Sequence, residues 1–348
     1  MPNFNFLTTH VGSVPHKDPV GLTHRLAGLL DIPAWLQLPR RNYLENIYTQ
    51  YAATLPGAVV DAEKERAVMR TDGQTFEQEL EAFYQSYLDD NLDDFALTPD
   101  CALGFFTLLD ELRPRPVEWV KGQVMGPISF GLTVTDQNLR ASLYNETLAD
   151  ALVKHMSMNA RWQVQQLKTA GRNVILFVDE PYMASFGSAF ISLSREQALD
   201  YMNEVYDAVH REGGLVGVHC CGNTDWGLLL ASKADILNLD AYAFIENLAL
   251  YPDDLRAFLD RGGAVAWGVV PNFEAIRDVT PQMLADRLRT GIQLICDRAA
   301  SRGVTIRPDE FAARSLVTPA CGLGPTTVEI AEEVFEKMAE MGEILQRW

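Results

Sequence analysis

The chain has 348 residues, of which 47% are hydrophobic and 22% charged, as is ordinary for a globular protein with a large core. Its formal net charge of −18 argues against nucleic acid and anionic lipid as main partners, because both repel an acidic surface. No apolar run approaches the ~20 residues that a bilayer-spanning helix needs, so no membrane partner is expected either.

The N-terminus and the cysteines predict a cytoplasmic protein. The first ten residues contain no basic region followed by an apolar stretch, and therefore no signal peptide is expected. The five cysteines are odd in number, and Cys220 and Cys221 are adjacent, which does not suit a disulfide framework. In a reducing compartment, clustered cysteines are more often ligands or catalysts than crosslinks.

Short apolar strands alternate with segments of helical periodicity along the chain, which is typical of a parallel sheet covered by helices. Eight repeats of this pattern in one chain predict an α/β fold of the (β/α)8 TIM-barrel type. A capping box at Ser194 and Gln197 predicts the start of one of the helices. The eight strands are expected at residues 6–9, 58–61, 118–124, 174–178, 215–219, 236–240, 264–270 and 315–318.

We expect one catalytic TIM-barrel domain over residues 1–348. Two long insertions interrupt its N-terminal half, at roughly 14–57 and 62–116. Both have helical periodicity, and the second includes an acidic run from 88 to 94. They are interpreted as elaborations of the barrel, since neither resembles a separate domain.

Polar residues gather at the carboxyl ends of the predicted strands, where TIM barrels build their active sites. The apolar runs alone define the predicted strands. The polar residues at their ends are therefore independent support for both the fold and the site. The residues concerned are Thr8 to Ser13, Gly126 and Pro127, Asp179 to Pro181, His219 to Gly222, Asp240 and Cys321.

Four of these residues predict a metal site. His219 and Cys221 are two apart on an extended segment, so both side chains point the same way. Such a pair alone is common in protein cores, but Asp240 and Cys321 follow other strands, and the four together are zinc ligand types. Alternatively, Asp240 caps a loop or binds an arginine, and Cys321 is a small residue in a tight turn. Cys220 is the alternative ligand if the strand register differs by one.

Two further groups predict substrate contacts. Asp179 and Glu180 end an apolar strand, and paired carboxylates there could bind a substrate ammonium group or supply acid/base catalysis. A salt bridge to a basic residue at a neighbouring strand end is the structural alternative. Gly12 and Ser13 follow the first strand, where backbone N–H groups and a hydroxyl suit a carboxylate, although an ordinary turn has the same composition.

The chain resembles the C-terminal catalytic half of cobalamin-independent methionine synthase. That family belongs to a superfamily with uroporphyrinogen decarboxylase and the corrinoid:thiol methyltransferases. Residues 9–15 resemble the family's T-x-I-G-S-F-P opening, and residues 178–181 resemble its V-D-E-P motif. The His-x-Cys pair, the acid ending the next strand and the P-x-C-G motif at 319–322 are similar to its zinc ligands in type and order. The resemblance extends from about residue 8 to residue 324.

The resemblance implies specific roles. It makes His219, Cys221, Asp240 and Cys321 ligands of Zn²⁺. It also places Gly12 and Ser13 at the carboxylate of homocysteine and Asp179 near its amino group. The family has glutamate where this chain has Asp240, whose shorter arm is expected to bind zinc less well.

The resemblance also bears on the methyl donor. The chain has the length of the catalytic half alone, and it resembles short "core" methionine synthases that take the methyl group from methylcobalamin or a corrinoid protein. Residues 32–39 resemble theirs and are expected in the first insertion, near the barrel mouth. The expected activity is zinc-dependent methyl transfer to the thiol of homocysteine, forming methionine. The alternatives are a corrinoid-dependent methyltransferase with another thiol acceptor, such as coenzyme M, and a metal-free porphyrinogen decarboxylase-like enzyme.

Overall fold

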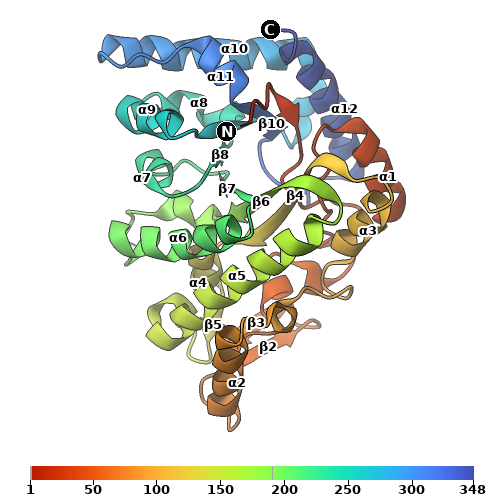
Figure 1. Cartoon of the computed structure of the whole chain (residues 1–348), viewed down its shortest axis with the longest axis vertical. Coiled ribbons are helices and arrows are strands. Elements are labelled where there is room, and N and C mark those ends of the chain that lie inside the picture. Colours follow the sequence, from red (N-terminus) through yellow and green to blue (C-terminus); the bar gives the residue numbers. More distant parts are fainter. Residues whose placement is uncertain (1, 190) are drawn as a thin grey trace.

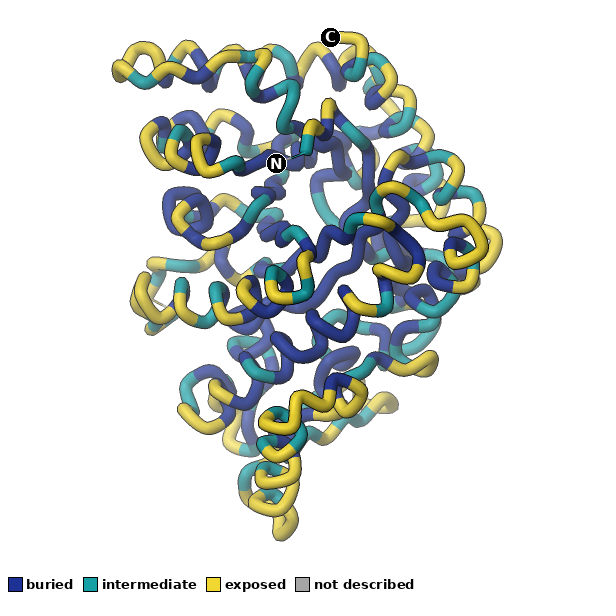
Figure 2. Tube along the Cα trace, viewed as in Figure 1, coloured by how far each residue is buried: buried dark blue, intermediate teal, exposed yellow. Residues whose placement is uncertain are grey.

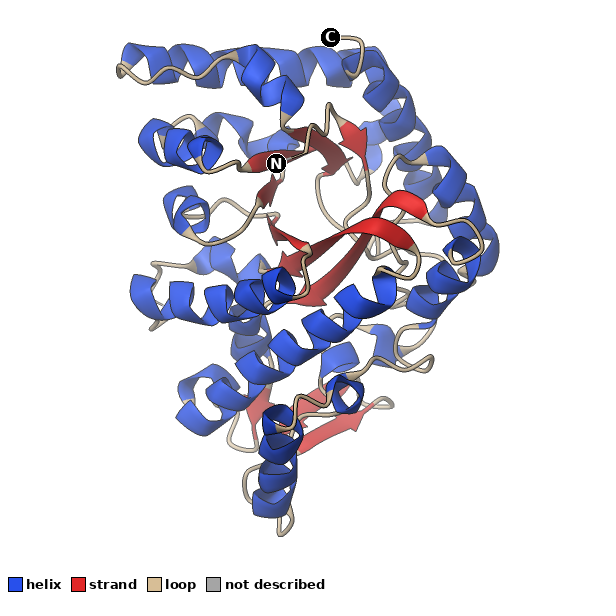
Figure 3. Cartoon of the chain, in the orientation of Figure 1, coloured by secondary structure: helices blue, strands red, loops and turns tan. Residues whose placement is uncertain are grey.

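The computed structural model describes residues 2–189 and 191–348 (Figure 1). Seven parallel strands in this part of the chain form a curled sheet that helices surround (Figure 3). This arrangement confirms the predicted α/β, TIM-barrel-like fold. In the order of the sheet, the strands are β1 (Leu7–Thr8), β10 (Ser315–Pro319), β9 (Ala264–Val270), β8 (Ile236–Leu239), β7 (Leu215–Cys220), β6 (Gly171–Asp179) and β4 (Val117–Met125).

The central strands are buried on both faces, which explains their continuous apolar sequences. Every residue of β8 and β9 is buried, and the curled sheet is dark over most of its length in Figure 2. The parallel register pairs Asp179 with His219, and His219 with Asn238. The carboxyl ends of β6, β7 and β8 therefore lie side by side at one rim.

The predicted barrel strand at 58–61 is wrong in its position, although a strand forms there. β2 (Ala58–Asp61) pairs antiparallel with β3 (Arg66–Met69), which in turn pairs with β5 (Thr135–Asp136) in a separate three-stranded sheet. Val59 is 46% exposed, whereas β8 and β9 of the curled sheet are buried throughout. Figure 1 shows this small sheet beside α2, at the opposite end of the molecule from the C-terminus.

Residues 32–38 bridge the gap between β1 and β4 instead. The Ile32 N–H donates to Thr8 O (3.0 Å), the Lys121 N–H donates to Pro33 O (2.8 Å), and the Gln37 N–H donates to Gly12 O (3.1 Å). Because Pro33 has no N–H, the segment makes isolated bridges and not a regular ladder. The segment that the sequence places in the first insertion thus fills a gap in the sheet, and its Gln37 lines the cavity at the rim, near the barrel mouth as expected.

The helices of the described residues cover the outside of the curled sheet (Figure 3). The predicted capping box is confirmed at the start of α6, where Ser194 and Gln197 exchange hydrogen bonds. None of the described helices combines the length and apolar character that crossing a membrane requires. The helices are α1 (Val20–Leu29), α2 (Phe76–Leu88), α3 (Leu103–Leu112), α4 (Pro127–Thr133), α5 (Glu146–Leu167), α6 (Arg195–Arg211), α7 (Trp226–Ala231), α8 (Ala241–Leu248), α9 (Pro252–Asp260), α10 (Pro281–Ser301), α11 (Pro308–Ala313) and α12 (Val328–Leu345).

Candidate metal centre and substrate cavity

Three of the four predicted metal ligands meet at the carboxyl rim of the sheet. His219 lies in β7, Cys221 directly follows it, and Cys321 follows β10. Their ligand atoms all lie within 4.8 Å of one another, and His219 Nε2 lies 3.7 Å from Cys321 Sγ. The curl of the sheet brings together residues that are a hundred positions apart in the sequence.

The three side chains shift one another's protonation. A hydrogen bond from Cys321, assisted by His219, lowers the pKa of the Cys221 thiol to about 4 against the effect of burial. The same hydrogen bond, together with burial, raises the pKa of Cys321. Burial lowers the pKa of His219, but Cys221, Asp179 and Asn238 together raise it above its usual value. This arrangement favours the thiolate form of Cys221, and metal binding would displace the protons that remain on the group.

Asp240, the fourth predicted ligand, lies outside this group. Its carboxylate accepts a hydrogen bond from the Ala243 N–H (2.8 Å) and caps the N-terminus of α8. The structure therefore favours the alternative in which Asp240 caps a loop or helix. Cys220, the other candidate ligand, is buried and directs its thiol to Gly222 O (3.5 Å).

Asp179 ends β6 and lines the cavity beside His219. Its Oδ1 atom is buried and has no hydrogen-bond partner among the described residues. Burial raises the pKa of Asp179 to about 6, although His219 and Lys121 pull it downward. Lys121 is itself fully buried and donates to Val11 O (2.6 Å). Asp179 therefore lines the cavity with a carboxylate of which one oxygen has no hydrogen-bond partner among the described residues.

Glu180, predicted to take part in catalysis, is placed in a structural position instead. Its carboxylate accepts hydrogen bonds from the Ile128 N–H (3.0 Å), the Ser129 N–H (2.8 Å) and the Ser129 hydroxyl (2.6 Å). These donors belong to the first turn of α4. Glu180 is fully buried and is not among the residues that line the cavity.

Gly12 and Ser13 lie where the β1 loop meets the loop that carries Cys321. The Leu323 N–H donates to Ser13 O (2.8 Å), and the Gly324 N–H donates to the Ser13 hydroxyl (3.3 Å). A Cβ atom at Gly12 would lie 2.8 Å from the Gln123 side chain, so a larger residue there would displace the Gln123 amide. Ser13 lines the cavity, whereas Gly12 lies behind the lining and supports the turn.

The three ligand residues lie in a cavity of 410 Å³. Among the described lining residues, Arg40 is the one lysine or arginine, and it donates to Gly324 O (3.1 Å) and Pro325 O (2.9 Å). The cavity is lined by Val11, Ser13, Gln37, Pro39, Arg40, Asn46, Ile47, Tyr48, Asp179, Pro181, His219, Cys221, Cys321, Gly322, Gly324 and Pro325.

Gln37 is a cavity residue that the sequence did not single out, and its amide orientation follows from its neighbours. Gln50 Nε2 donates to the backbone carbonyl of Cys101 (2.5 Å), which can only accept. The Gln50 oxygen therefore faces Gln37 and accepts from Gln37 Nε2 (2.8 Å). Gln37 Oε1 is left without a partner among the described residues, on the side of the amide away from Gln50. The one signal in the sequence is a glutamine in the otherwise apolar run 34–39.

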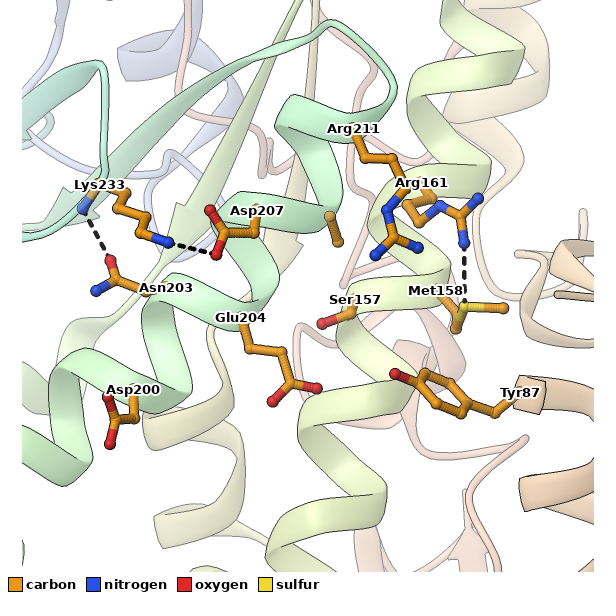
Figure 4. A pocket seen from close by; sticks show the side chains of 11 residues that line it. Tyr87, Ser157, Met158, Arg161, Asp200, Asn203, Glu204, Asp207, Arg211 and Lys233 are labelled. Carbon is orange, nitrogen blue, oxygen red and sulfur yellow. Dashed lines mark hydrogen bonds and ion pairs between the residues drawn. The ribbon is translucent and has the colours of Figure 1, made fainter.

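A second hollow, of 490 Å³, lies between α5 and α6 (Figure 4). Its basic side chains include Arg161, which pairs with Asp90 and Glu212, and Lys233, whose ammonium lies 2.5 Å from Asp207. It contains none of the predicted site residues. The cavity at the sheet rim is therefore the candidate functional site.

No protein-family model matches the chain, and no curated protein sequence does either. Among solved structures, the chain is similar to a B12-independent methionine synthase from Shewanella sp. W3-18-1 in complex with selenomethionine. The two are 15% identical, the match covers 98% of each chain, and the TM-score is 0.58. The exo-β-1,4-mannosidase Op5Man5 from Opitutaceae bacterium strain TAV5 is 11% identical over 76% of this chain and 56% of its own, with a TM-score of 0.32. The first of these similarities shows that this chain has the fold of that methionine synthase.

Proposed function

We propose that this protein is a zinc-dependent methyltransferase that moves a methyl group from methylcobalamin or a corrinoid protein to the thiol of homocysteine. The observation that carries the proposal is the group formed by His219, Cys221 and Cys321 at the cavity. A family resemblance in the sequence motifs points to the same chemistry.

The donor set fits zinc. One imidazole nitrogen and two thiol sulfurs are preferred zinc ligands, and catalytic zinc sites commonly use three protein ligands with one open position. The Cys221 thiol has a lowered pKa, which favours the thiolate form that metals bind. Cavity space adjoins the group, so a substrate atom could take the fourth position.

The remaining polar groups suit an amino-acid acceptor. Asp179 offers an unpaired carboxylate oxygen, and Gln37 offers an amide oxygen, so both can accept hydrogen bonds from an ammonium group. The Ser13 hydroxyl accepts from Gly324 and keeps its own hydrogen for a substrate carboxylate. Coenzyme M has no ammonium group, so these acceptors favour homocysteine over that alternative.

In the proposed chemistry, zinc would activate the thiol and the residues of the chain would orient the reactants. A free thiol is only a few per cent ionised at neutral pH, and bound zinc would stabilise the thiolate of homocysteine. Asp179 and Gln37 would hold the amino group so that the sulfur faces the His–Cys–Cys group. Pro39, Ile47 and Tyr48 give the cavity an apolar surface, across which the methyl group of the donor would approach the sulfur. Orientation of the two reactants then contributes much of the rate enhancement.

Zinc content and methyl transfer test the proposal together. The purified protein is expected to hold one zinc per chain and to convert methylcobalamin and homocysteine to methionine. The Cys321→Ser variant should lose most of both properties while keeping its fold by circular dichroism. Wild-type protein with neither zinc nor turnover would refute the proposal, and turnover with coenzyme M but not homocysteine would favour the other acceptor class.

A further inference from the structure

The imidazole of His219 can bind a metal through either nitrogen, and the choice depends on which nitrogen carries the proton. Nε2 faces Cys321 Sγ at 3.7 Å, whereas Nδ1 lies 2.6 Å from Asn238 Oδ1. If Nδ1 is protonated, the Nε2 lone pair points at the other two ligands. If Nε2 is protonated, it has no lone pair to offer, and His219 cannot bind a metal together with the two cysteines.

The orientation of the Asn238 amide answers this question. Asn238 lies in β8 and is fully buried, and its Nδ2 donates to Ala266 O (2.8 Å) in β9 and to Thr318 Oγ1 (2.9 Å) in β10. A backbone carbonyl can only accept a hydrogen bond. A flipped amide would therefore place two oxygens against each other at that distance. The amide nitrogen must face Ala266, and the amide oxygen must face His219.

We propose that Asn238 is a positioning residue that keeps the proton of neutral His219 on Nδ1 and directs the Nε2 lone pair toward Cys221 and Cys321. The amide of Asn238 is held by hydrogen bonds to β9 and β10 and not by β7, which carries His219. Its orientation therefore does not depend on the metal. The inference deepens the proposed function, because it rests on the metal site proposed there. Removal of a residue that hydrogen-bonds to a metal ligand commonly lowers metal affinity by ~10–100-fold.

A matched set of variants separates this role from simple packing. Asn238→Ala removes the oxygen that accepts from Nδ1. Thr318→Val removes the second acceptor of Asn238 but leaves Ala266 O in place. We expect the zinc dissociation constant, measured by chelator competition, to rise ~10–100-fold in Asn238→Ala and to change only a few-fold in Thr318→Val.

Nitrogen NMR of protein labelled with ¹⁵N-histidine gives a readout that packing alone would not change. In the metal-free wild type at alkaline pH, where the imidazole is neutral, His219 should show the Nδ1–H tautomer. Thr318→Val should keep it, and Asn238→Ala should show a mixture of tautomers.

An Nε2–H tautomer in the wild type would overturn the inference, and this result does not depend on whether any variant folds. Unchanged tautomer and zinc affinity in a folded Asn238→Ala variant would also overturn it. A wild type that has the Nδ1–H tautomer but binds no zinc would refute the proposed function and leave the role of Asn238 in orienting His219 intact.

Discussion

Gly126 lies directly against the carboxylate of Glu180, so that a Cβ atom at Gly126 would lie 2.2 Å from Glu180 Cδ. This contact joins two motifs that are separate in the sequence, the glycine and proline after β4 and the Asp-Glu-Pro after β6. Glu180 accepts hydrogen bonds from the first turn of α4, and Gly126 immediately precedes that turn. The glycine leaves room for the acid, and the acid holds the helix start.

Replacement of Gly126 by alanine should destabilise the protein, because Cβ would displace a buried and fully bonded carboxylate. Overpacking of this kind costs ~1–3 kcal/mol in the free energy of unfolding, which denaturant titration measures. Gly21→Ala is the matched control. Gly21 lies in helix α1, nothing lies within 4 Å of a Cβ placed there, and alanine favours a helix. Equal stability of the two variants would contradict the contact.

The buried carboxyl of Glu180 should also make stability depend on pH. Burial raises the pKa of Glu180 from 4.5 to about 7, although its three hydrogen-bond donors act in the opposite direction. Between these pH values the folded state holds a proton that the unfolded chain has released. This contribution is fully present below about pH 4.5 and is lost as the pH rises through about 7.

Glu180→Gln should lack this dependence. The difference in unfolding free energy between wild type and variant is expected to move in favour of the wild type by ~3 kcal/mol on going from about pH 7 to 4.5. Denaturant titrations at several pH values measure this difference, and other titrating groups cancel between the two proteins. A difference that stays constant, or grows as the pH rises, would contradict a raised pKa.

The strand pattern of the sequence predicted most of the fold, because central parallel strands are apolar on both faces and stand out between helices. It failed at residues 32–38, where Pro33 interrupts the ladder and the segment makes only isolated bridges. The strand at 58–61 was predicted correctly as a strand but assigned to the wrong sheet. An exposed edge strand and a barrel strand differ in tertiary surroundings that four residues do not encode.

The site was predictable to the extent that it depends on residue type at strand ends. His219, Cys221 and Cys321 meet as their ligand chemistry indicated. For Glu180 and Asp240, the sequence could not distinguish a carboxylate that faces a cavity from one that faces a helix start, since both follow a strand directly. The roles proposed for Asn238 and Gln37 depend on the orientation of an amide, which the surrounding carbonyl groups determine and the sequence does not.

Asp240 should be dispensable for metal binding, because its carboxylate caps α8. Asp240→Ala is expected to lower the unfolding free energy by ~1 kcal/mol through loss of the cap, whereas Asp240→Ser keeps a capping oxygen and should cost less. Both variants should retain the zinc stoichiometry of the wild type. Loss of zinc from both, measured by elemental analysis, would instead make Asp240 a ligand.

Gln37 should contribute to binding only when the acceptor carries an ammonium group. Gln37→Leu removes the amide oxygen, and loss of one hydrogen bond to a charged group is expected to raise KM for homocysteine by ~10-fold or more. The KM for 4-mercaptobutanoate, which lacks the amino group, should stay within a few-fold of the wild-type value. An equal rise in KM for both thiols would show that Gln37 shapes the cavity without recognising the amine.

Arg40 should strengthen metal binding from a distance by holding the loop that carries Cys321. Its guanidinium donates to Gly324 O and Pro325 O, and these bonds join the barrel wall to the loop three residues beyond the ligand. Arg40→Gln should leave the loop free to move. Zinc binding would then have to order Cys321, and this ordering would lower the free energy gained on binding.

If ordering the loop costs about 1 kcal/mol of binding free energy, the zinc dissociation constant should rise by ~5-fold, as measured by chelator competition. Arg70→Gln is the charge-matched control, because it removes an equal charge from an exposed pair with Asp72 that directly follows β3. Equal weakening in both variants would assign the effect to net charge, whereas weakening confined to Arg40→Gln requires the contact with the Cys321 loop.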